Sequence, residues 1–171
     1  MYDIEKHSEM ILVKKAKRGD VKAFAELYGR FYKELYRFAL YTMKNMEDAE
    51  DVVSEAVLSA FENIRKLKKE ESFRSWIFTI LANHCKRKFL TQKQTEELPE
   101  EMSASHEHKF EEIHDVRQAF QKLEEVDRLI VAGSVLGGYA SEEIGEILDM
   151  NPATVRSRKS RAMEKLRLML E

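Results

Sequence analysis

The stretch that decides the fold is SEEIGEILDMNPATVRSRKSRAMEKLR, from Ser141 to Arg167. Its first part repeats apolar residues at the spacing of one helical face, at Ile144, Ile147 and Leu148. Asn151 and Pro152 then mark the start of a second helix, because an asparagine side chain caps free N–H groups and proline has none to satisfy. The pattern predicts two helices joined by a tight turn.

The second of these helices separates apolar and polar residues onto opposite faces. The predicted buried stripe consists of Val155, Ala162, Leu166 and Leu170. The opposite face carries Arg156, Ser157, Ser160 and Arg161. This arrangement is typical of a helix-turn-helix, whose second helix presents cations and small donors to a DNA groove. A charged helix face is often only solvated. The basic residues of this chain, whose net charge is −2, are nevertheless concentrated on this helix, which favours DNA binding.

The composition predicts a globular, mostly helical protein. The chain has 171 residues, of which 43% are apolar and 35% charged, and it contains only two prolines. Its single cysteine, Cys85, cannot form a disulfide framework or a cysteine-based zinc site, which suits the cytoplasm. The chain shows neither an apolar signal core nor a membrane-length apolar run. We therefore expect a cytoplasmic protein without membrane insertion.

Charge and periodicity divide the chain into three parts. Residues 1–90 carry 18 basic and 14 acidic side chains, residues 91–112 carry 2 and 7, and residues 113–171 carry 9 and 10. The middle segment is also aperiodic and contains Pro99. The sequence therefore predicts an all-α protein with two helical domains, 1–90 and 113–171, joined by a flexible acidic linker, 91–112.

Four helices are expected in the first domain. A short helix from Ser8 to Lys17 precedes Gly19 and an Asp20 cap. The second helix runs to about Met43, with an apolar face of Val21, Phe24, Leu27, Tyr28, Phe31 and Leu35. The third follows Asn45, with an apolar face of Ala49, Val52, Val53, Ala56, Val57, Ala60, Phe61 and Ile64. After an exposed loop, the fourth runs from Phe73 to Leu90, with Phe73, Trp76, Ile77, Ile80 and Leu81 inward.

Two charged groups in this domain have more than one physical explanation. The third helix begins with acidic residues: Glu47, Asp48, Glu50, Asp51 and Glu55. They either complement the helix dipole or form a surface for a basic partner. The fourth helix ends in Lys86, Arg87 and Lys88, which suit nucleic-acid phosphates but equally suit the negative end of a helix.

The second domain is expected to contain four helices in all. Helices from Ile113 to Leu123 and from Val126 to Leu136 precede a Gly137-Gly138 turn and the helix-turn-helix. His106, His108 and His114 lack the spacing and context of a metal site. Neither a nucleophile–base pair nor a cofactor motif is recognisable in the sequence. We therefore expect no metal, no cofactor and no enzymatic activity.

Taken together, these segments resemble the bacterial sigma factors of the extracytoplasmic-function (ECF) class over nearly the whole chain. Residues Ala16–Tyr32 resemble the opening signature of that family. The segment Asp48–Glu55 resembles its polymerase-binding helix, and Ser72–Ile77 with Ala82-Asn83 resembles its promoter-opening helix. Residues Glu142–Ile144 with Thr154–Arg158 resemble its upstream-element reader.

The resemblance implies a transcription initiation factor that brings core RNA polymerase to a two-part promoter. The residues expected to bind the clamp coiled coil of the polymerase are Asp48, Glu50, Asp51 and Glu55. Those expected at the downstream, minus-ten element are Lys68, Lys69, Ser72, Arg74, Trp76, Asn83, Lys86, Arg87 and Lys88. Those expected at the upstream, minus-thirty-five element are Thr154, Arg156, Ser157, Arg158, Ser160, Arg161 and Lys165, with Arg158 and Lys165 on phosphates.

Several residues depart from the family pattern. Asp149 replaces the usual glycine of the turn, and Ala140 replaces the usual serine cap, so Ser141 is expected to cap instead. Lys159 falls on the buried stripe and must extend to solvent.

The resemblance also implies an anti-sigma factor as a partner, and we expect a monomer when the protein is free. Two other functions fit the residues: a free-standing helix-turn-helix regulator, and a module that only sequesters polymerase.

Overall fold

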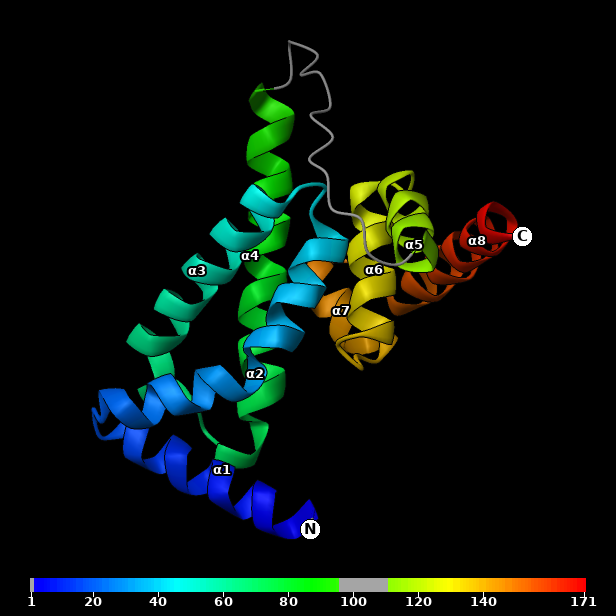
Figure 1. Ribbon diagram of the computed structural model, residues 1–171. Helices are drawn as coiled ribbons and strands as arrows, with labels where there is room; N and C mark the ends of the chain where they lie inside the picture. The colour runs from blue at the N-terminus through cyan, green and yellow to red at the C-terminus, as the bar shows by residue number, and fades with distance from the viewer. Residues whose placement is uncertain (1, 96–110) are drawn as a thin grey trace.

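The computed structural model describes residues 2–95 and 111–171, and every element in these two segments is helical (Figure 1). The N-terminal segment contains α1 (Tyr2–Lys17), α2 (Val21–Thr42), α3 (Met46–Asn63) and α4 (Phe73–Thr95), with 3₁₀ turns η1 (Ile64–Lys66) and η2 (Glu70–Ser72). The C-terminal segment contains α5 (Glu111–Gln121), α6 (Glu125–Val135), α7 (Ser141–Leu148) and α8 (Pro152–Leu170). Most of the predicted linker, with His106 and His108, lies outside the described residues.

The helix boundaries of the N-terminal segment follow from local chemistry. Gly19 adopts φ +95° after α1, and the Asp20 carboxylate then accepts a hydrogen bond from the Ala23 N–H at 3.0 Å, capping α2. Asn45 caps α3 in the same way, accepting from the Asp48 N–H at 2.8 Å. The predicted caps are confirmed. α1 begins earlier than the predicted Ser8, and α4 continues past Leu90.

Most of the predicted apolar faces form the core of this segment. Edge-to-face ring pairs join α2 to its neighbours, with centroids 5.8 Å apart for Phe38 and Phe78 and 5.1 Å apart for Phe24 and Phe61. Three expectations were wrong. Val21 is exposed because it lies in the first turn of α2, and Phe61 is 42% exposed although its ring packs against Phe24. Leu67 is buried, so the loop between α3 and α4 is anchored rather than wholly exposed.

The C-terminal helices enclose a second, smaller cluster of apolar side chains. Its members come from α5, α6, α8 and the turn after α5: Ala119, Phe120, Leu123, Val131, Ala162 and Leu166. Leu170, expected to be buried, is exposed because it is the last residue of its helix, and Val135 at the end of α6 is exposed as well. Figure 1 shows the end of α8 pointing away from the rest of the protein. Within the described residues, no helix is long and apolar enough to cross a membrane.

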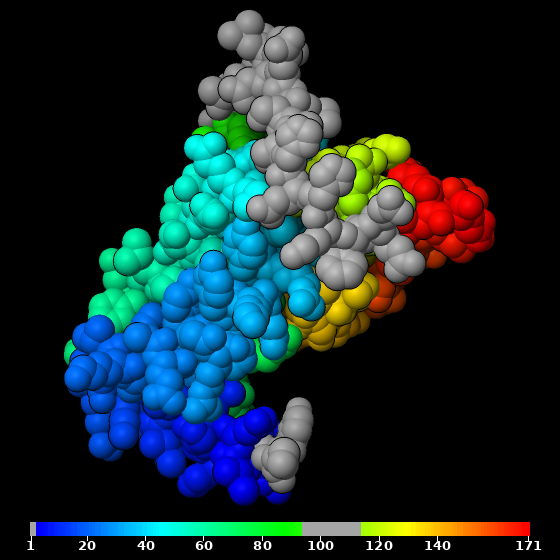
Figure 2. All heavy atoms as spheres, in the orientation of Figure 1, coloured from blue at the N-terminus to red at the C-terminus, as the bar shows by residue number. Residues whose placement is uncertain are grey.

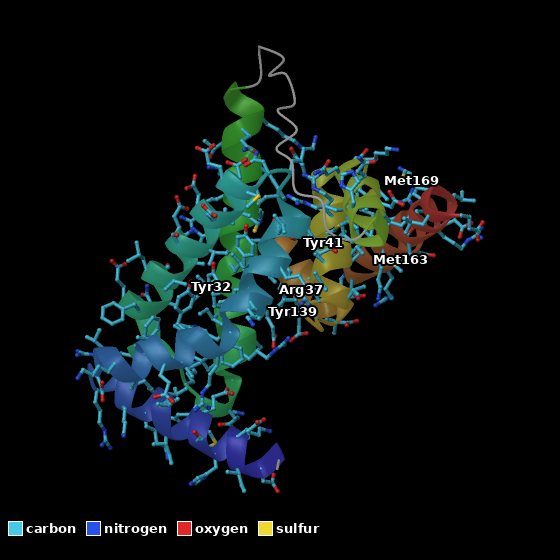
Figure 3. All side chains as sticks on the ribbon, viewed as in Figure 1. Tyr32, Arg37, Tyr41, Tyr139, Met163 and Met169 are labelled. Carbon is cyan, nitrogen blue, oxygen red and sulfur yellow. The ribbon has the colours of Figure 1, made fainter. Side chains whose placement is uncertain are left out.

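The two halves of the chain pack directly against each other. A single apolar cluster continues from α2 and α4 into α6 and α7. Figure 2 shows the yellow-to-red C-terminal helices lying against the N-terminal half. Tyr41 of α2, labelled in Figure 3, packs edge-to-face against Phe120 of α5, with the ring centroids 5.0 Å apart. The two halves therefore share a core.

Side chains on both sides of this interface donate hydrogen bonds to backbone carbonyls of the other half. Arg74 Nη1 donates to the Gly137 carbonyl at 3.2 Å, and Lys86 Nζ donates to the Ile147 carbonyl at 3.1 Å. In the opposite direction, the Tyr139 hydroxyl donates to the Ser75 carbonyl at 3.1 Å. Burial raises the pKa of Tyr139 to about 12, so its hydroxyl keeps this proton at neutral pH.

Arg128 of α6 makes the most deeply buried of these contacts, with 2% of its surface exposed. Its Nε donates to the Thr42 carbonyl at the end of α2 at 2.8 Å, and its Nη1 donates to the Leu123 carbonyl at 2.7 Å. The guanidinium also lies over the Phe89 ring of α4, 5.8 Å from the centroid. Burial lowers the pKa of Arg128, although the nearby charge of Glu125 partly opposes this. One side chain therefore joins α2, α4 and α6.

We expect Arg128→Ala to lower the free energy of unfolding by about 2–4 kcal/mol, because it leaves buried carbonyls without donors and opens a cavity. Urea denaturation followed by circular dichroism measures this change. Arg37→Ala is the matched control, since Arg37 is an exposed arginine on α2 and its removal should change stability by less than about 0.5 kcal/mol. Equal effects of the two substitutions would contradict the structural role of Arg128.

Candidate nucleic-acid interface

The turn between α7 and α8 is tight and makes specific demands on the sequence. Asp149 adopts the left-handed conformation, with φ +53°, which aspartate tolerates better than most residues. The Met150 N–H then donates to the Gly145 carbonyl at 2.8 Å. A Cβ on Gly145 would lie 2.6 Å from the Met150 carbonyl oxygen. The turn therefore needs glycine inside α7, a requirement that sequence analysis missed.

Caps fix both helices of the helix-turn-helix. The Asn151 side chain accepts from the Ala153 N–H at 2.8 Å, as predicted for the start of α8. At the start of α7 the expectation was wrong. Ala140 occupies the cap position, and the Glu143 carboxylate accepts from its N–H at 2.8 Å, so Ser141 is already the first helical residue.

The predicted DNA-facing side of α8 is open to solvent. The exposed residues on this side and along the helix include Thr154, Arg156, Ser157, Ser160, Arg161 and Lys165. Val155, Ala162 and Leu166 are buried behind them. Arg156 pairs with Glu142 of α7 at 2.9 Å, with both side chains largely exposed. Arg161 and Lys165 form no ion pair with any described residue. These side chains can bind phosphates or base edges without first breaking a buried contact.

Arg158 departs from the expectation that it contacts phosphates. Its Nε pairs with Asp127 at 2.7 Å and its Nη2 with Glu124 at 2.8 Å, and 25% of the side chain is exposed. Burial opposes the charge of Arg158, but hydrogen bonds from the guanidinium to the two carboxylates outweigh this effect and raise its pKa. Arg158 therefore holds α8 against the start of α6.

The acidic residues of α3 fall into two groups. Glu50, Asp51 and Glu55 are exposed. Asp48 is not: its side chain is 16% exposed and contacts Lys88 at 3.1 Å and Gln92 at 2.7 Å. Burial opposes ionisation of Asp48, but these hydrogen bonds and one from Asn45 outweigh it and hold its pKa below the usual value. Asp48 thus joins α3 to α4, while the other three carboxylates face solvent.

The predicted minus-ten residues of the loop and the start of α4 are also divided. Lys68 and Lys69 are exposed. Arg74, by contrast, pairs with Glu34 of α2 at 2.9 Å in addition to its bond with the Gly137 carbonyl. The remaining two, Ser72 and Trp76, are half-buried, and Trp76 packs beside the buried Phe73 ring.

The basic end of α4 shows the same division. Lys86 is bonded to the Ile147 carbonyl, and Lys88 pairs with Asp48 and Asp51. Arg87 is exposed and Asn83 is half-buried, and both line a hollow of about 500 Å³ between α3 and α4. Its other lining residues are Ser59, Ile80, His84, Lys86 and Leu90. The hollow combines donors with apolar surface, which suits an anionic or aromatic group.

Beside this hollow, His84 is buried and its Nδ1 lies 3.2 Å from a Glu55 carboxylate oxygen. Its Nε2 has no hydrogen-bond partner among the described residues. In the described part of the chain, no group of three or more histidine, cysteine, aspartate or glutamate side chains could hold a metal ion, and the ring of His114 lies 2.9 Å from the Gln118 side chain.

The sequence did not reveal the roles of Arg128, which joins the two halves, or of Gly145, which the turn of the helix-turn-helix requires. A visible signal existed for each: Arg128 is directly followed by the apolar run Leu129–Ala132, and Gly145 interrupts a short amphipathic helix. The partners of Arg128 could not be predicted, because Thr42 and Phe89 are distant in sequence and belong to the other half.

An all-α protein with an open recognition helix in one half and a basic helix beside an acidic one in the other belongs to the class of helical DNA-binding proteins. Comparison with known families identifies the type. Residues 27–95 match sigma-70 region 2, and residues 113–166 match sigma-70 region 4. Together these matches span most of the chain, which belongs to the sigma-70 family, in its ECF class.

Individual relatives agree with this assignment. ECF sigma factor SigM of Mycobacterium tuberculosis is 28% identical over 89% of this chain and 79% of its own, and SigW of Bacillus subtilis is 26% identical over 92% and 94%. Among solved structures, sigma factor RpoE of Bartonella quintana has a TM-score of 0.73 at 22% identity, covering 88% of this chain and 98% of its own. CnrH has a TM-score of 0.66 at 21% identity, covering 95% and 97%.

The protein is therefore a transcription initiation factor that directs RNA polymerase to promoters. Sigma factors are not enzymes; the polymerase supplies the chemistry. Of the three functions considered for the sequence, the family assignment selects this one over a free-standing regulator and a sequestering module.

We expect Gly145→Ala to destabilise the protein by about 2–4 kcal/mol, because the new Cβ would collide with a backbone oxygen. Gly29→Ala is the matched control: it also lies inside a helix, but with open space around it, and should stabilise the protein by roughly 0.5–1 kcal/mol. Thermal and urea denaturation of both variants measure the difference. Equal tolerance of Gly145→Ala and Gly29→Ala would contradict the close approach of the Met150 carbonyl oxygen to Gly145.

Proposed function

We propose that the exposed carboxylates of α3 bind the basic coiled coil of the polymerase clamp. Glu50, Asp51 and Glu55 are the acidic residues of the predicted set that face solvent. The side chains of Asp51 and Glu55 are 54% and 61% exposed; Asp51 contacts Lys88 at 3.4 Å, and Glu55 contacts the buried His84 at 3.2 Å. Complementary charge at such a surface accelerates association and selects the partner. Asp48 supports this surface from within rather than binding the clamp.

At the promoter, the exposed side of α8 binds the major groove of the upstream element. Arg156, Ser157, Ser160 and Arg161 are the side chains that contact base edges, and Lys165 contacts a phosphate. Support comes from their exposure, from the capped and buried frame behind them, and from the match of this half to sigma-70 region 4.

The downstream element is bound by the α3–α4 loop and the outer side of α4. Lys68, Lys69 and Arg87 offer exposed cations to the DNA backbone, while Asn83 and the hollow beside it offer donors and apolar surface to an unstacked base. Arg74, Lys86 and Lys88 reach the DNA only after their internal contacts break.

The packed arrangement of the two halves cannot contact both promoter elements at once. Lys86 of α4 is bonded to the carbonyl of Ile147, and the first residue of α8 is Pro152, so the two DNA-binding helices approach within about 20 Å. Elements centred near minus ten and minus thirty-five are about 25 base pairs apart, or roughly 85 Å along the duplex. The halves must therefore separate when the protein works with polymerase.

An anti-sigma factor is a further proposed partner. The solved structure of RpoE from Bartonella quintana is described as a complex with the anti-sigma factor NepR, and that of CnrH as a complex with the cytosolic domain of CnrY. A protein of this kind would prevent initiation by holding the halves together or by covering the α3 carboxylates.

The clamp contact is tested by reversing charge on α3. We expect Asp51→Lys with Glu55→Lys to reduce specific transcription at least about tenfold, because like charges then face each other across the interface. The assay is run-off transcription by core polymerase and this protein, on a promoter that the holoenzyme itself selects from randomised DNA. Glu62→Lys, at an exposed position on the last turn of α3, is the control and should transcribe normally. Undiminished transcription by the double variant would refute the assigned surface.

Separation of the halves is tested by energy transfer between dyes on cysteines placed at Lys33 of α2 and Leu168 of α8, both exposed and neither assigned to DNA or polymerase. The native Cys85 is buried, and its burial raises the thiol pKa, so it should resist labelling. We expect efficient transfer in the free protein and a marked fall once core polymerase and promoter DNA are added. Transfer that stays high in the transcribing complex would show that the halves remain packed.

A further inference from the structure

A lysine of α1 reaches the loop that joins α3 to α4. Lys17 is the last residue of α1, and its Nζ donates to the Leu67 carbonyl at 2.7 Å and to the Glu70 carboxylate at 3.2 Å. These partners are 50 and 53 residues away in sequence. Lys17 matches none of the sites expected for polymerase or DNA, so its contacts need another explanation.

The two partners of Lys17 lie on either side of an exposed pair of lysines in the sequence. Leu67 is buried, Lys68 and Lys69 are exposed, and Glu70 turns back toward Lys17, so that its side chain is 24% exposed. A single ammonium group thus bonds to the chain immediately before and immediately after the two lysines. The rest of the loop is fixed by local bonds, from the Leu67 N–H to the Ile64 carbonyl and from the Ser72 N–H to the Lys69 carbonyl.

The position of Lys17 is itself fixed by the start of the chain. The Gly19 turn, with φ +95°, and the Asp20 cap determine where α1 ends relative to α2. The Lys17 side chain is 23% exposed, so its stem is packed rather than free. The pKa of Glu70 lies below its usual value, first because its own N–H donates to the carboxylate and then because Lys17 does. Glu70 therefore remains a charged partner at neutral pH.

We propose that Lys17 is a positioning residue for promoter recognition, holding the α3–α4 loop so that Lys68 and Lys69 face the phosphates of the downstream element. This inference rests on the proposed function of that loop. Lys17 touches no DNA in this role; it acts through the backbone at Leu67 and the side chain of Glu70. Small displacements of binding groups weaken recognition strongly, which is why such groups are held by a supporting layer of contacts.

A purely structural tie between α1 and the loop is the competing explanation. A partly exposed ion pair usually contributes little to stability, and its loss would affect all activities alike. The positioning role instead affects strand opening and its dependence on salt, because the lysines of the loop bind phosphates, while binding of core polymerase and recognition of the upstream element stay unchanged. These two explanations therefore give different results in one set of assays.

The test compares Lys17→Met, Lys17→Arg and the control Lys15→Met, which removes an exposed lysine from the same helix. Holoenzyme containing each variant is mixed with the selected promoter carrying a fluorescent base analogue that reports strand opening. The same measurement is made over a range of salt concentrations and on a promoter with the upstream element scrambled. We expect Lys17→Met to lower strand opening about tenfold and to reduce its dependence on salt, Lys17→Arg to restore most of it, and Lys15→Met to match the unmodified protein.

Core-polymerase affinity and melting temperature are measured on the same variants. Unchanged strand opening in Lys17→Met would overturn the inference, and so would a parallel loss of core affinity, upstream discrimination and melting temperature. A double variant, Lys68→Ala with Lys69→Ala, tests the loop separately. If that variant opens the promoter normally, the proposed function of the loop has failed; if it does not but Lys17→Met does, only the inference about Lys17 has failed.

Discussion

The arrangement of the two halves depends on a buried guanidinium group. Arg128 has no carboxylate within ion-pair distance among the described residues; its acceptors are the carbonyls of Thr42 and Leu123. The Thr42 carbonyl belongs to the last turn of α2, where carbonyl groups lack helical partners and carry the negative end of the helix dipole. Arg128 therefore satisfies a helix end that would otherwise face an apolar interface, and it can do so only while the halves are packed.

The polar contacts across this interface suit the proposed separation of the halves. A buried charge pays a large desolvation cost, so an apolar side chain of similar size would often hold such an interface more firmly. The neighbouring contacts of Arg74, Lys86 and Tyr139 likewise end on backbone carbonyls, and water can replace each donor after separation. Arg74 and Lys86 are also candidates for the promoter. The proposed separation of the halves would thus free two groups proposed to bind DNA at the same time as it exposes the Thr42 carbonyl.

The sequence predicted the helices and most of the buried faces, because periodicity and caps are local properties. Asp20, Asn45 and Asn151 cap the helices they were expected to cap. It failed where a side chain finds a distant partner. Asp48 and Arg158 looked like surface residues of a helix, but Lys88 and Gln92 enclose the first, while Glu124 and Asp127 hold the second. Helical spacing shows which face a residue occupies, not whether another helix lies against that face.

The same limit explains how the charged residues divide between structure and recognition. In each charged group, members facing another helix are paired internally, and those facing solvent remain available for binding. The internally paired members are Asp48 on α3, Lys88 on α4 and Arg158 on α8. Their exposed counterparts on the same helices are Glu50, Arg87 and Arg161. Internal pairs fix the helices relative to each other, which reduces the freedom that the exposed members lose on binding. Lys17 and the lysines at 68 and 69 repeat this relation around a single loop, where one half-buried cation fixes the direction of two exposed ones. A surface residue in this protein is therefore best understood together with the internal pair that supports it.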